Sequence, residues 1–478
     1  MTYLDRLDSY KDDMLKTLAA SISKKSVLSQ PVKTEGGELL PFGRDIHEAF
    51  IHILKEGEEM GFDVVNVDNY GGHIEFRASE EIQDPEVLAI SAHIDVVPEG
   101  TGWTSDPYTM VEKDGYVYGR GVADDKGPLI ACLYAMKAIK EEGIIPKKTI
   151  RLVLGLDEET DKDGMYYYLD RVGQPDMGFT PDGSFPLVNG EMGILIFDLA
   201  QKFNNRPGKD ELRLTRLEAG TAPNIVPRLA KAVISGSEEE YNLIRNKIDL
   251  YCAETGYNVT AKKQGISLVI TAEGLAAHGA HPDLGLNAVS IIMEVLGKIE
   301  FGNEELNDFI FAYNEYIGFN YNGEKIGCGF YDENSGPLIF NIGMANINED
   351  LASVTVNIRY PVSNTDKDVF GGIEETIRDT NIGIVKKMHE SPVFFSLDNP
   401  MVEKMLKAYV DETGDTENKP EVSGGGTYAK VIDNTLAFGA LFPGEEDTMH
   451  QADEKMSIES FNRMARIYAR AIYSICCE

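Results

Sequence analysis

Residues 87–95 read VLAISAHID, and they carry the clearest fold signal in the chain. The first six residues form a short, nearly all-apolar run, which is typical of a strand buried on both faces. After a glycine-rich turn, helical periodicity returns over residues 129–139, and residues 149–156 (TIRLVLGL) form a second strand of the buried type. Strand, helix and strand in this order predict a βαβ unit within a parallel sheet.

The middle of the chain has a different pattern. From about residue 193 to residue 359 the predicted strands alternate apolar and polar residues, and amphipathic helices lie between or beside them. This pattern is typical of an antiparallel sheet with helices on one face. We therefore predict an α/β domain formed by residues 1–190 and 385–478, interrupted by an inserted α+β domain over residues 191–384.

The composition is that of a globular protein with an acidic surface. Of the 478 residues, 42% are hydrophobic and 26% are charged, which suits two or three domains with sizeable cores. With 45 Lys and Arg against 79 Asp and Glu, the net charge is −34. Such a chain repels phosphate backbones and anionic lipids, so we expect neither nucleic acid nor a membrane surface as a partner.

Several classes of protein are also excluded by what the sequence lacks. No segment approaches the roughly 20 uninterrupted apolar residues of a membrane span, and the first residues do not have the pattern of a signal peptide. The five cysteines show neither metal-ligand spacing nor a disulfide framework. We therefore expect a cytoplasmic protein.

The first candidate site residues follow the first buried strand. His93 and Asp95 come directly after the apolar run, and alternation along an extended chain places both side chains on the same side. In an open α/β sheet, ligands bind at the carboxyl ends of the strands. His93 is therefore a candidate metal ligand, oriented by Asp95. The alternative is a surface histidine with ordinary hydrogen bonds.

Further carboxylates and a histidine occur in similar places. Asp124 and Asp125 precede a helix, residues 157–159 (Asp-Glu-Glu) follow the second buried strand, Asp182 lies in a turn, and His450 precedes the last helix. Each has an ordinary alternative, such as a helix cap or an exposed acidic turn. Together they offer the nitrogen and oxygen ligands that zinc, cobalt or manganese accept. Because the sequence has no GxSxG motif and no cysteine with an obvious histidine partner, metal-activated water is the best remaining nucleophile.

Nine segments follow one another along nearly the whole chain: SAHIDVVPEG, GWTSDPY, YGRGVADDKGP, DEET, TPDGSFPLVNGE, AHGAHP, IRYP, SGGGTYA and HQADE. Together they resemble the dinuclear-zinc peptidases related to aminoacylase and carnosinase, and most closely the dipeptidase V type. The resemblance implies a catalytic domain with a mixed, mainly parallel sheet and helices on both faces. It also implies that the inserted domain is a lid with an antiparallel sheet.

The resemblance further implies a role for each site residue. It places the ligands of two zinc ions, which share one bridging carboxylate, at His93, Asp124 and Asp182 for the first ion and at Asp124, Glu159 and His450 for the second. Glu158 corresponds to the general base, and Asp95 to the residue that braces His93. The resemblance also implies a cis peptide bond just before Asp125. Cobalt or manganese are alternatives to zinc, since they accept similar ligands.

In the lid, the resemblance assigns substrate contacts. His278 corresponds to the histidine that stabilises the tetrahedral oxyanion, although His281, three residues later, is an alternative. Asn224 and Arg359 correspond to positions that contact substrate, and a guanidinium suits a C-terminal carboxylate because it offers two parallel hydrogen bonds. Gly425–Gly426 would let backbone N–H groups approach the same carboxylate.

The expected function is therefore that of a dipeptidase. In the family that the chain resembles, aspartate rather than glutamate at the position of Asp182 goes with a need for a free α-amino group. The resemblance therefore implies a peptidase that acts on small dipeptides with a free N-terminus and binds two Zn²⁺ ions per subunit. An N-acyl amino acid deacylase of the same fold is the alternative, and a peptide-binding protein without catalysis is a third. We expect a monomer, with a dimer formed through the lid as the other arrangement.

Overall fold

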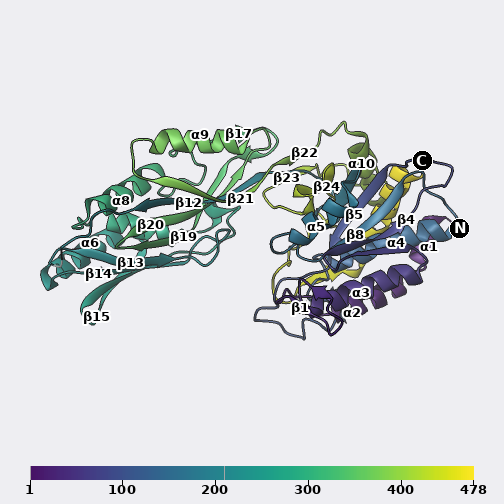
Figure 1. Ribbon diagram of the computed structural model, residues 1–478, viewed down its shortest axis with the longest axis horizontal. Coiled ribbons are helices and arrows are strands. Elements are labelled where there is room, and N and C mark those ends of the chain that lie inside the picture. The colour runs from purple at the N-terminus through teal and green to yellow at the C-terminus, as the bar shows by residue number, and fades with distance from the viewer. Residues whose placement is uncertain (1, 209) are drawn as a thin grey trace. The chain divides into compact units, whose positions relative to one another are not determined.

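The computed structural model describes residues 2–208 and 210–478, and these form two compact units (Figure 1). The first unit comprises Met1–Gly190, Val393–Val422 and Gly426–Glu478, and the second comprises Glu191–Pro392 and Ser423–Gly425. The boundary expected between residues 384 and 385 falls inside strand β21 (Gly383–Glu390). That strand belongs to the second unit because it pairs with β12 (Gly193–Lys202).

The first unit is built on a mixed nine-stranded sheet. At its centre β5 lies between β8 and β9, and β9 also pairs with β24, with all three pairs parallel. Antiparallel strands extend both sides. The two strands predicted from the apolar runs are β5 and β8, so the βαβ prediction is confirmed. The spatial order is β22 (Val393–Phe394), β11 (Val188–Glu191), β24 (Thr435–Ala437), β9 (Met177–Thr180), β5 (Val87–His93), β8 (Thr149–Gly155), β4 (Gly71–Phe76) and β3 (Asp63–Val67), and β23 (Glu421–Ser423) pairs with β11.

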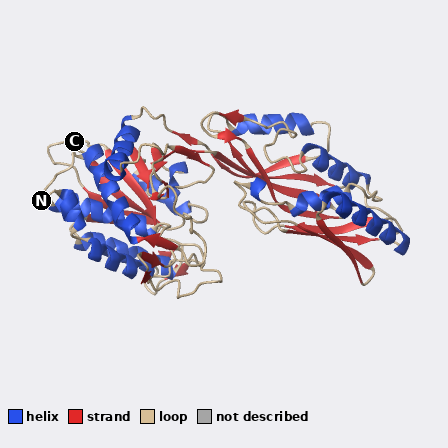
Figure 2. Cartoon of the chain, turned by 180° about the vertical axis from the view of Figure 1, so that it is seen from behind, coloured by secondary structure: helices blue, strands red, loops and turns tan. Residues whose placement is uncertain are grey.

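Helices cover both faces of this sheet, as the predicted fold class requires (Figure 2). Along β5, Leu88 and Ile90 enter the larger core, whereas Ala89 enters a smaller cluster on the opposite face, because side chains alternate along a strand. The smaller cluster is covered by α5 (Asp163–Val172) and the 3₁₀ helix η2 (Tyr428–Lys430). The larger core is covered by α1 (Tyr3–Asp8), α2 (Lys11–Ile22), α3 (Arg44–Glu59), α4 (Lys126–Glu141), α10 (Pro400–Thr413) and α11 (Ile458–Cys476).

Helix α4 lies at the centre of the larger core. Nearly every residue from Lys126 to Ile139 is buried, and α11 packs against it. The turn that leads into α4 is tight: a Cβ atom on Gly127 would lie 2.1 Å from the main-chain oxygen of Val122, so only glycine fits there. The carboxylates that precede the helix are therefore held on a fixed backbone.

The second unit is an α+β structure. All neighbours in its eight-stranded sheet are antiparallel, and buried residues alternate with partly buried ones along most of β12, as the sequence predicts. The spatial order is β15 (Asn258–Gln264), β16 (Ser267–Glu273), β14 (Leu229–Ser235), β13 (Arg213–Ala219), β19 (Ile339–Asn348), β20 (Leu351–Tyr360), β12 and β21. The helices that share its core are α6 (Glu238–Thr255), α7 (Ala288–Leu296), α8 (Glu304–Tyr316) and α9 (Asp366–Ile377).

Short elements complete both units. Strand β26 (Lys455–Ser457) pairs with β7 (Tyr116–Tyr118), which in turn pairs with β6 (Val111–Lys113). The others are β1 (Val32–Lys33), β2 (Leu39–Leu40), β10 (Gly183–Ser184), β25 (Ala440–Leu441), β17 (Tyr331–Asp332), β18 (Gly336–Pro337) and the 3₁₀ helix η1 (Pro282–Leu284). Within the described part of the chain, no helix combines the length and the apolar character needed to cross a lipid bilayer.

Candidate metal centre and active site

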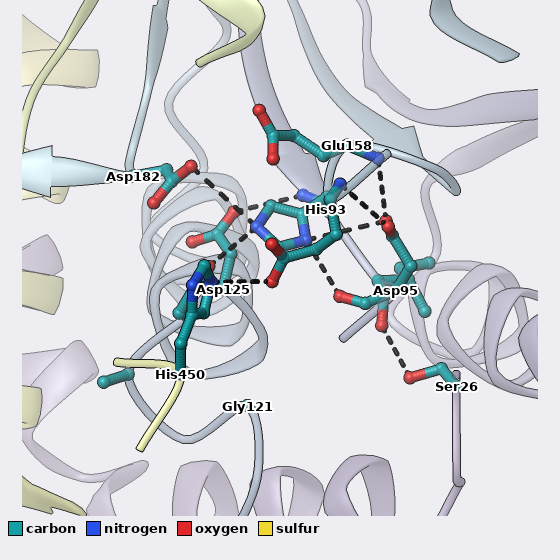
Figure 3. Close-up of polar contacts among 12 residues, drawn as sticks. Ser26, His93, Asp95, Gly121, Asp125, Glu158, Asp182 and His450 are labelled. Carbon is teal, nitrogen blue, oxygen red and sulfur yellow. Dashed lines mark hydrogen bonds and ion pairs between the residues drawn. The ribbon is translucent and has the colours of Figure 1, made fainter. Parts of the chain in front are cut away.

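Four of the predicted site residues are supplied by the ends of strands and by the start of α4. His93 is the last residue of β5, Glu159 follows β8, Asp182 follows β9, and Asp124 lies just before α4. Because β8, β5 and β9 are adjacent and parallel, their carboxyl ends meet at one edge of the sheet, where ligands bind in open α/β sheets. His450 joins them from the loop before β26, and the side chains gather around His93 (Figure 3).

Asp124 has a different histidine at each of its carboxylate oxygens. Its Oδ1 lies 2.8 Å from Nε2 of His93, and its Oδ2 lies 2.8 Å from Nε2 of His450. Each of these histidine nitrogens also lies near a second carboxylate. Nε2 of His450 is 3.1 Å from Oε1 of Glu159, and Nε2 of His93 is 3.8 Å from Oδ2 of Asp182. The donor atoms thus fall into two groups on either side of one carboxylate.

These donor atoms fit a bound metal. The ligand atoms of His93, Asp124 and Glu159 all lie within 4.8 Å of one another, and so do those of His93, Glu158 and Asp182. Imidazole nitrogen with carboxylate oxygen is a donor set that zinc and related divalent ions accept. Because Glu158 is one of the residues near His93 and Asp182, the residue expected to act as the general base lies beside the ligand atoms.

The side chains of this cluster perturb one another strongly. Burial opposes the charge of His450, but hydrogen bonds with Asp124 and Glu159 outweigh it and raise the His450 pKa to about 11. Burial and repulsion from Asp124 raise the pKa of Asp182 well above its usual range. Burial also raises the pKa of Glu158 to about 7, against the attraction of Lys162. Strong shifts caused by burial and by specific charged partners are typical of a functional site.

Asp95 contacts His93 mainly through its main chain. Nδ1 of His93 lies 2.9 Å from the main-chain oxygen of Asp95, whereas the Asp95 carboxylate is 3.6 Å from it. Nδ1–H therefore donates to a carbonyl, which leaves Nε2 facing Asp124. The Asp95 carboxylate instead accepts the main-chain N–H groups of Glu158, at 3.2 Å, and of Glu159, at 3.1 Å. The carboxylate therefore holds the turn after β8 in place.

Two further residues at the site carry no predicted role. Asp125 is fully buried and accepts the main-chain N–H of His93 at 3.1 Å, and the peptide bond that precedes it is cis, as the resemblance implies. Lys162 places Nζ 3.3 Å from Oε1 of Glu158 and donates to the main-chain oxygen of Gly426 at 3.2 Å. The signals in the sequence are the second aspartate of the Asp124–Asp125 pair and the lysine four residues after Glu158.

The remaining predicted residues divide between the units. Gly426 belongs to the first unit, and Asn224, His278, Arg359 and Gly425 to the second. The main-chain oxygen of Asn224 accepts the N–H of Gly279, next to His278, and Ile225 pairs with His278 as an isolated bridge, so the two predicted contacts are neighbours. Arg359 on β20 is 6% exposed, and its Nε and Nη1 have no hydrogen-bond partner among the described residues.

A mixed α/β sheet with histidine and carboxylate donors at the carboxyl ends of its central strands, and a buried carboxyl beside them, defines the class of metal-dependent hydrolases. The chain belongs to the peptidase family M20/M25/M40, whose family model matches residues 89–474, and it is a metallopeptidase.

Its relatives match it from end to end. It is 32% identical over 476 residues to "Putative dipeptidase" of Staphylococcus epidermidis, with 99% of each chain covered. It is 33% identical over 468 residues to "Putative dipeptidase YtjP" of Bacillus subtilis, with 97% of each covered. Human carnosine dipeptidase 1 has the same fold, with a TM-score of 0.55, 17% identity, and coverage of 98% of this chain and 97% of that one. Aminopeptidase PepT from Bacillus cereus does too, with a TM-score of 0.55, 15% identity, and coverage of 97% and 98%.

Proposed function

We propose that this metallopeptidase is a dipeptidase that hydrolyses the peptide bond of dipeptides with a free N-terminus. One observation carries the proposal: the two carboxylate oxygens of Asp124 face two different groups of metal-donor atoms, and the buried carboxyl of Glu158 lies beside them. The two bacterial relatives, which cover 99% and 97% of the chain, are both named putative dipeptidases, and these names support the same activity.

The residues present would hold two divalent cations. His93, Asp124 and Asp182 would bind the first, and Asp124, Glu159 and His450 the second, with Asp124 between them. We propose zinc as the metal, and cobalt and manganese accept the same donors. When bound, such a pair of ions polarises the scissile carbonyl and increases the acidity of water at the site.

Glu158 would act as the general base. Its carboxyl is buried, and Asp95 fixes its backbone, so the carboxylate is held beside the ligand atoms. From there it would take the proton of the attacking water and later donate it to the leaving amine. Lys162, 3.3 Å away, favours the ionised form that the first step needs.

The second unit would bind the rest of the substrate. The two unpartnered donor atoms of buried Arg359 suit a C-terminal carboxylate, because a guanidinium offers two parallel hydrogen bonds. Asn224 and the backbone of Gly425–Gly426 would contact the same end of the substrate, and His278 would stabilise the oxyanion.

The requirement for a free amino group rests on Asp182, whose carboxylate would lie near the substrate's α-ammonium group. The test uses protein stripped of metal and resupplied with Zn²⁺, Co²⁺ or Mn²⁺. Cleavage of Ala-Ala is compared with cleavage of N-acetyl-Ala-Ala. Metal-dependent cleavage of the free dipeptide alone is the expected result. Preference for the acetylated form would replace the proposal with a deacylase, and two bound metals without cleavage of either would favour a binding protein.

A further inference from the structure

Glu454 is a fully buried carboxylate that lies outside the proposed ligand set. Its Oε2 receives a hydrogen bond from Nη1 of Arg120 at 2.8 Å and lies 3.0 Å from the main-chain nitrogen of Gly121. Its Oε1 accepts from the main-chain N–H groups of Gly121 at 3.1 Å, Ala123 at 2.9 Å and Asp124 at 3.3 Å. One side chain thus accepts three main-chain N–H groups of the loop that ends at Asp124, in addition to the Arg120 guanidinium.

The same residue closes the loop that carries His450. Strands β7 and β26 pair antiparallel, so the loop after β7 and the loop before β26 leave the same end of this ribbon. The main-chain oxygen of Glu454 accepts the N–H of Gly119 at 3.0 Å, which extends the pairing by one step. Thr448 Oγ1 accepts the N–H of Lys455 at 3.1 Å and closes the His450 loop at its base. Glu454 therefore joins the Asp124 loop and the His450 loop.

The partner of Glu454 is itself fixed. The Arg120 guanidinium lies 5.1 Å from the ring centroid of Trp103, the single tryptophan of the sequence, and the Arg120 side chain is buried. A buried carboxylate with a guanidinium and three N–H donors is well satisfied, whereas loss of its charge would leave the buried Arg120 guanidinium without the opposite charge of Glu454. An amide at this position would also turn an NH₂ group toward N–H donors.

We propose that Glu454 is a positioning residue for the second metal ion: it sets the separation of Asp124 and His450, so that Asp124 Oδ2 and His450 Nε2 reach the same ion. The inference rests on the metal assignment made under the proposed function. It predicts that a change at Glu454 acts mainly on the ion held by Asp124, Glu159 and His450. Residues that hold metal ligands in place from outside the coordination sphere typically contribute about 10- to 100-fold in metal affinity.

The experiment titrates metal-free protein with Zn²⁺ and measures bound metal per chain at equilibrium. Glu454→Gln should bind the first ion as the wild-type protein does and the second about 10- to 100-fold more weakly. Its turnover should be low at limiting metal and recover at excess metal. Glu454→Asp, which keeps the charge, should recover part of the affinity, and Trp103 emission checks that each variant is folded around Arg120.

Two control variants make the result specific. Glu412→Gln removes a similar carboxylate from a partly buried pair with Arg466 and Arg470 in the same unit, and it should bind both ions normally. His450→Ala should bind one ion only and defines the behaviour of a protein without the second site. Wild-type affinity for both ions in Glu454→Gln would overturn the inference, and so would an equal loss in Glu412→Gln. A wild-type protein that binds a single ion would overturn the two-ion assignment, and with it this inference.

Discussion

The carboxylate of Asp95 holds the backbone of Glu158: its Oδ1 accepts the Glu158 N–H at 3.2 Å. Its other oxygen accepts the N–H of Glu159 at 3.1 Å, so one side chain orients both the proposed base and a proposed metal ligand. Asp95 is buried, which removes competition from water for these hydrogen bonds. Asp95 therefore fixes the turn after β8 with its carboxylate and contacts His93 with its main-chain oxygen.

Replacement of Asp95 tests this role. In Asp95→Asn one oxygen still accepts an N–H, but the NH₂ group faces a second N–H donor, so the turn must shift. We expect kcat to fall about 10-fold or more at saturating metal, with KM nearly unchanged, because positioning of a base acts on the chemical step. Steady-state kinetics with a free dipeptide provide the measurement. An unchanged kcat would show that the turn does not depend on the carboxylate.

Replacement of the proposed base separates catalysis from metal binding. Glu158→Gln keeps the shape of the side chain but cannot accept the proton, so we expect kcat to fall by about 10²- to 10⁴-fold. The metal content should stay at two ions per chain, measured on the same sample. Glu159→Gln is the matched control, because it should lose affinity for one ion. Substantial turnover by Glu158→Gln would remove Glu158 from the role of base.

Arg359 is expected to act on the carboxylate end of the substrate. Arg359→Ala should lower kcat/KM for a free dipeptide by about 10- to 100-fold, since a charge-assisted hydrogen bond contributes about 1.5–3 kcal/mol. The same variant should make little difference with the C-terminal amide of that dipeptide, which lacks the charge. Arg359→Lys should recover only part of the loss, because an ammonium cannot form two parallel hydrogen bonds. An equal loss of kcat/KM on both substrates would show that Arg359 does not act through the substrate carboxylate.

His73 makes the protein sensitive to acid. Burial, reinforced by Arg151, lowers its pKa from 6.5 to about 4, and its Nδ1 lies 2.7 Å from the hydroxyl of Tyr168. Because the folded-state pKa is the lower one, the unfolded chain binds more protons between these values. The contribution of His73 to stability is therefore complete above about pH 6.5 and declines by about 3 kcal/mol as the pH falls to about 4.

The variant His73→Asn keeps a group that can hydrogen-bond to the Tyr168 hydroxyl but does not titrate. Urea unfolding of metal-free protein at pH 7 and at pH 4.5 should show a smaller loss of stability in the variant than in the wild type. Equal losses in the two proteins would mean that other groups cause the acid sensitivity.

The sequence predicted the parts of the fold and site that local pattern controls. The apolar runs that form β5 and β8 are followed by His93 and by residues 157–159. The sequence alone therefore indicated that the candidate metal ligands lie at the carboxyl ends of these strands. The alternating strands of the second unit were likewise predicted. A strand buried on both faces has a continuous apolar run, whereas a strand buried on one face alternates apolar and polar residues, so both patterns can be read from the sequence.

Contacts between distant segments could not be predicted in this way. Glu454 and Gly121 are 333 positions apart, and nothing in either loop indicates the other. For Asp95, alternation placed the carboxylate on the side of His93, but the choice between His93 and the N–H groups of Glu158 and Glu159 depends on where the turn after β8 lies. Which hydrogen-bond donor such a carboxylate accepts from is decided by the positions of the competing donors in the folded state.

The discontinuity of the first unit has a consequence for synthesis. β24, α11 and His450 all come after the inserted second unit, so they leave the ribosome after it. Until then the nascent chain holds His93, Asp124, Glu159 and Asp182 without the histidine that completes the second group of donors, and α4 lacks the helix that packs on it. The proposed two-ion centre therefore cannot assemble until the segment that carries His450 has been synthesised.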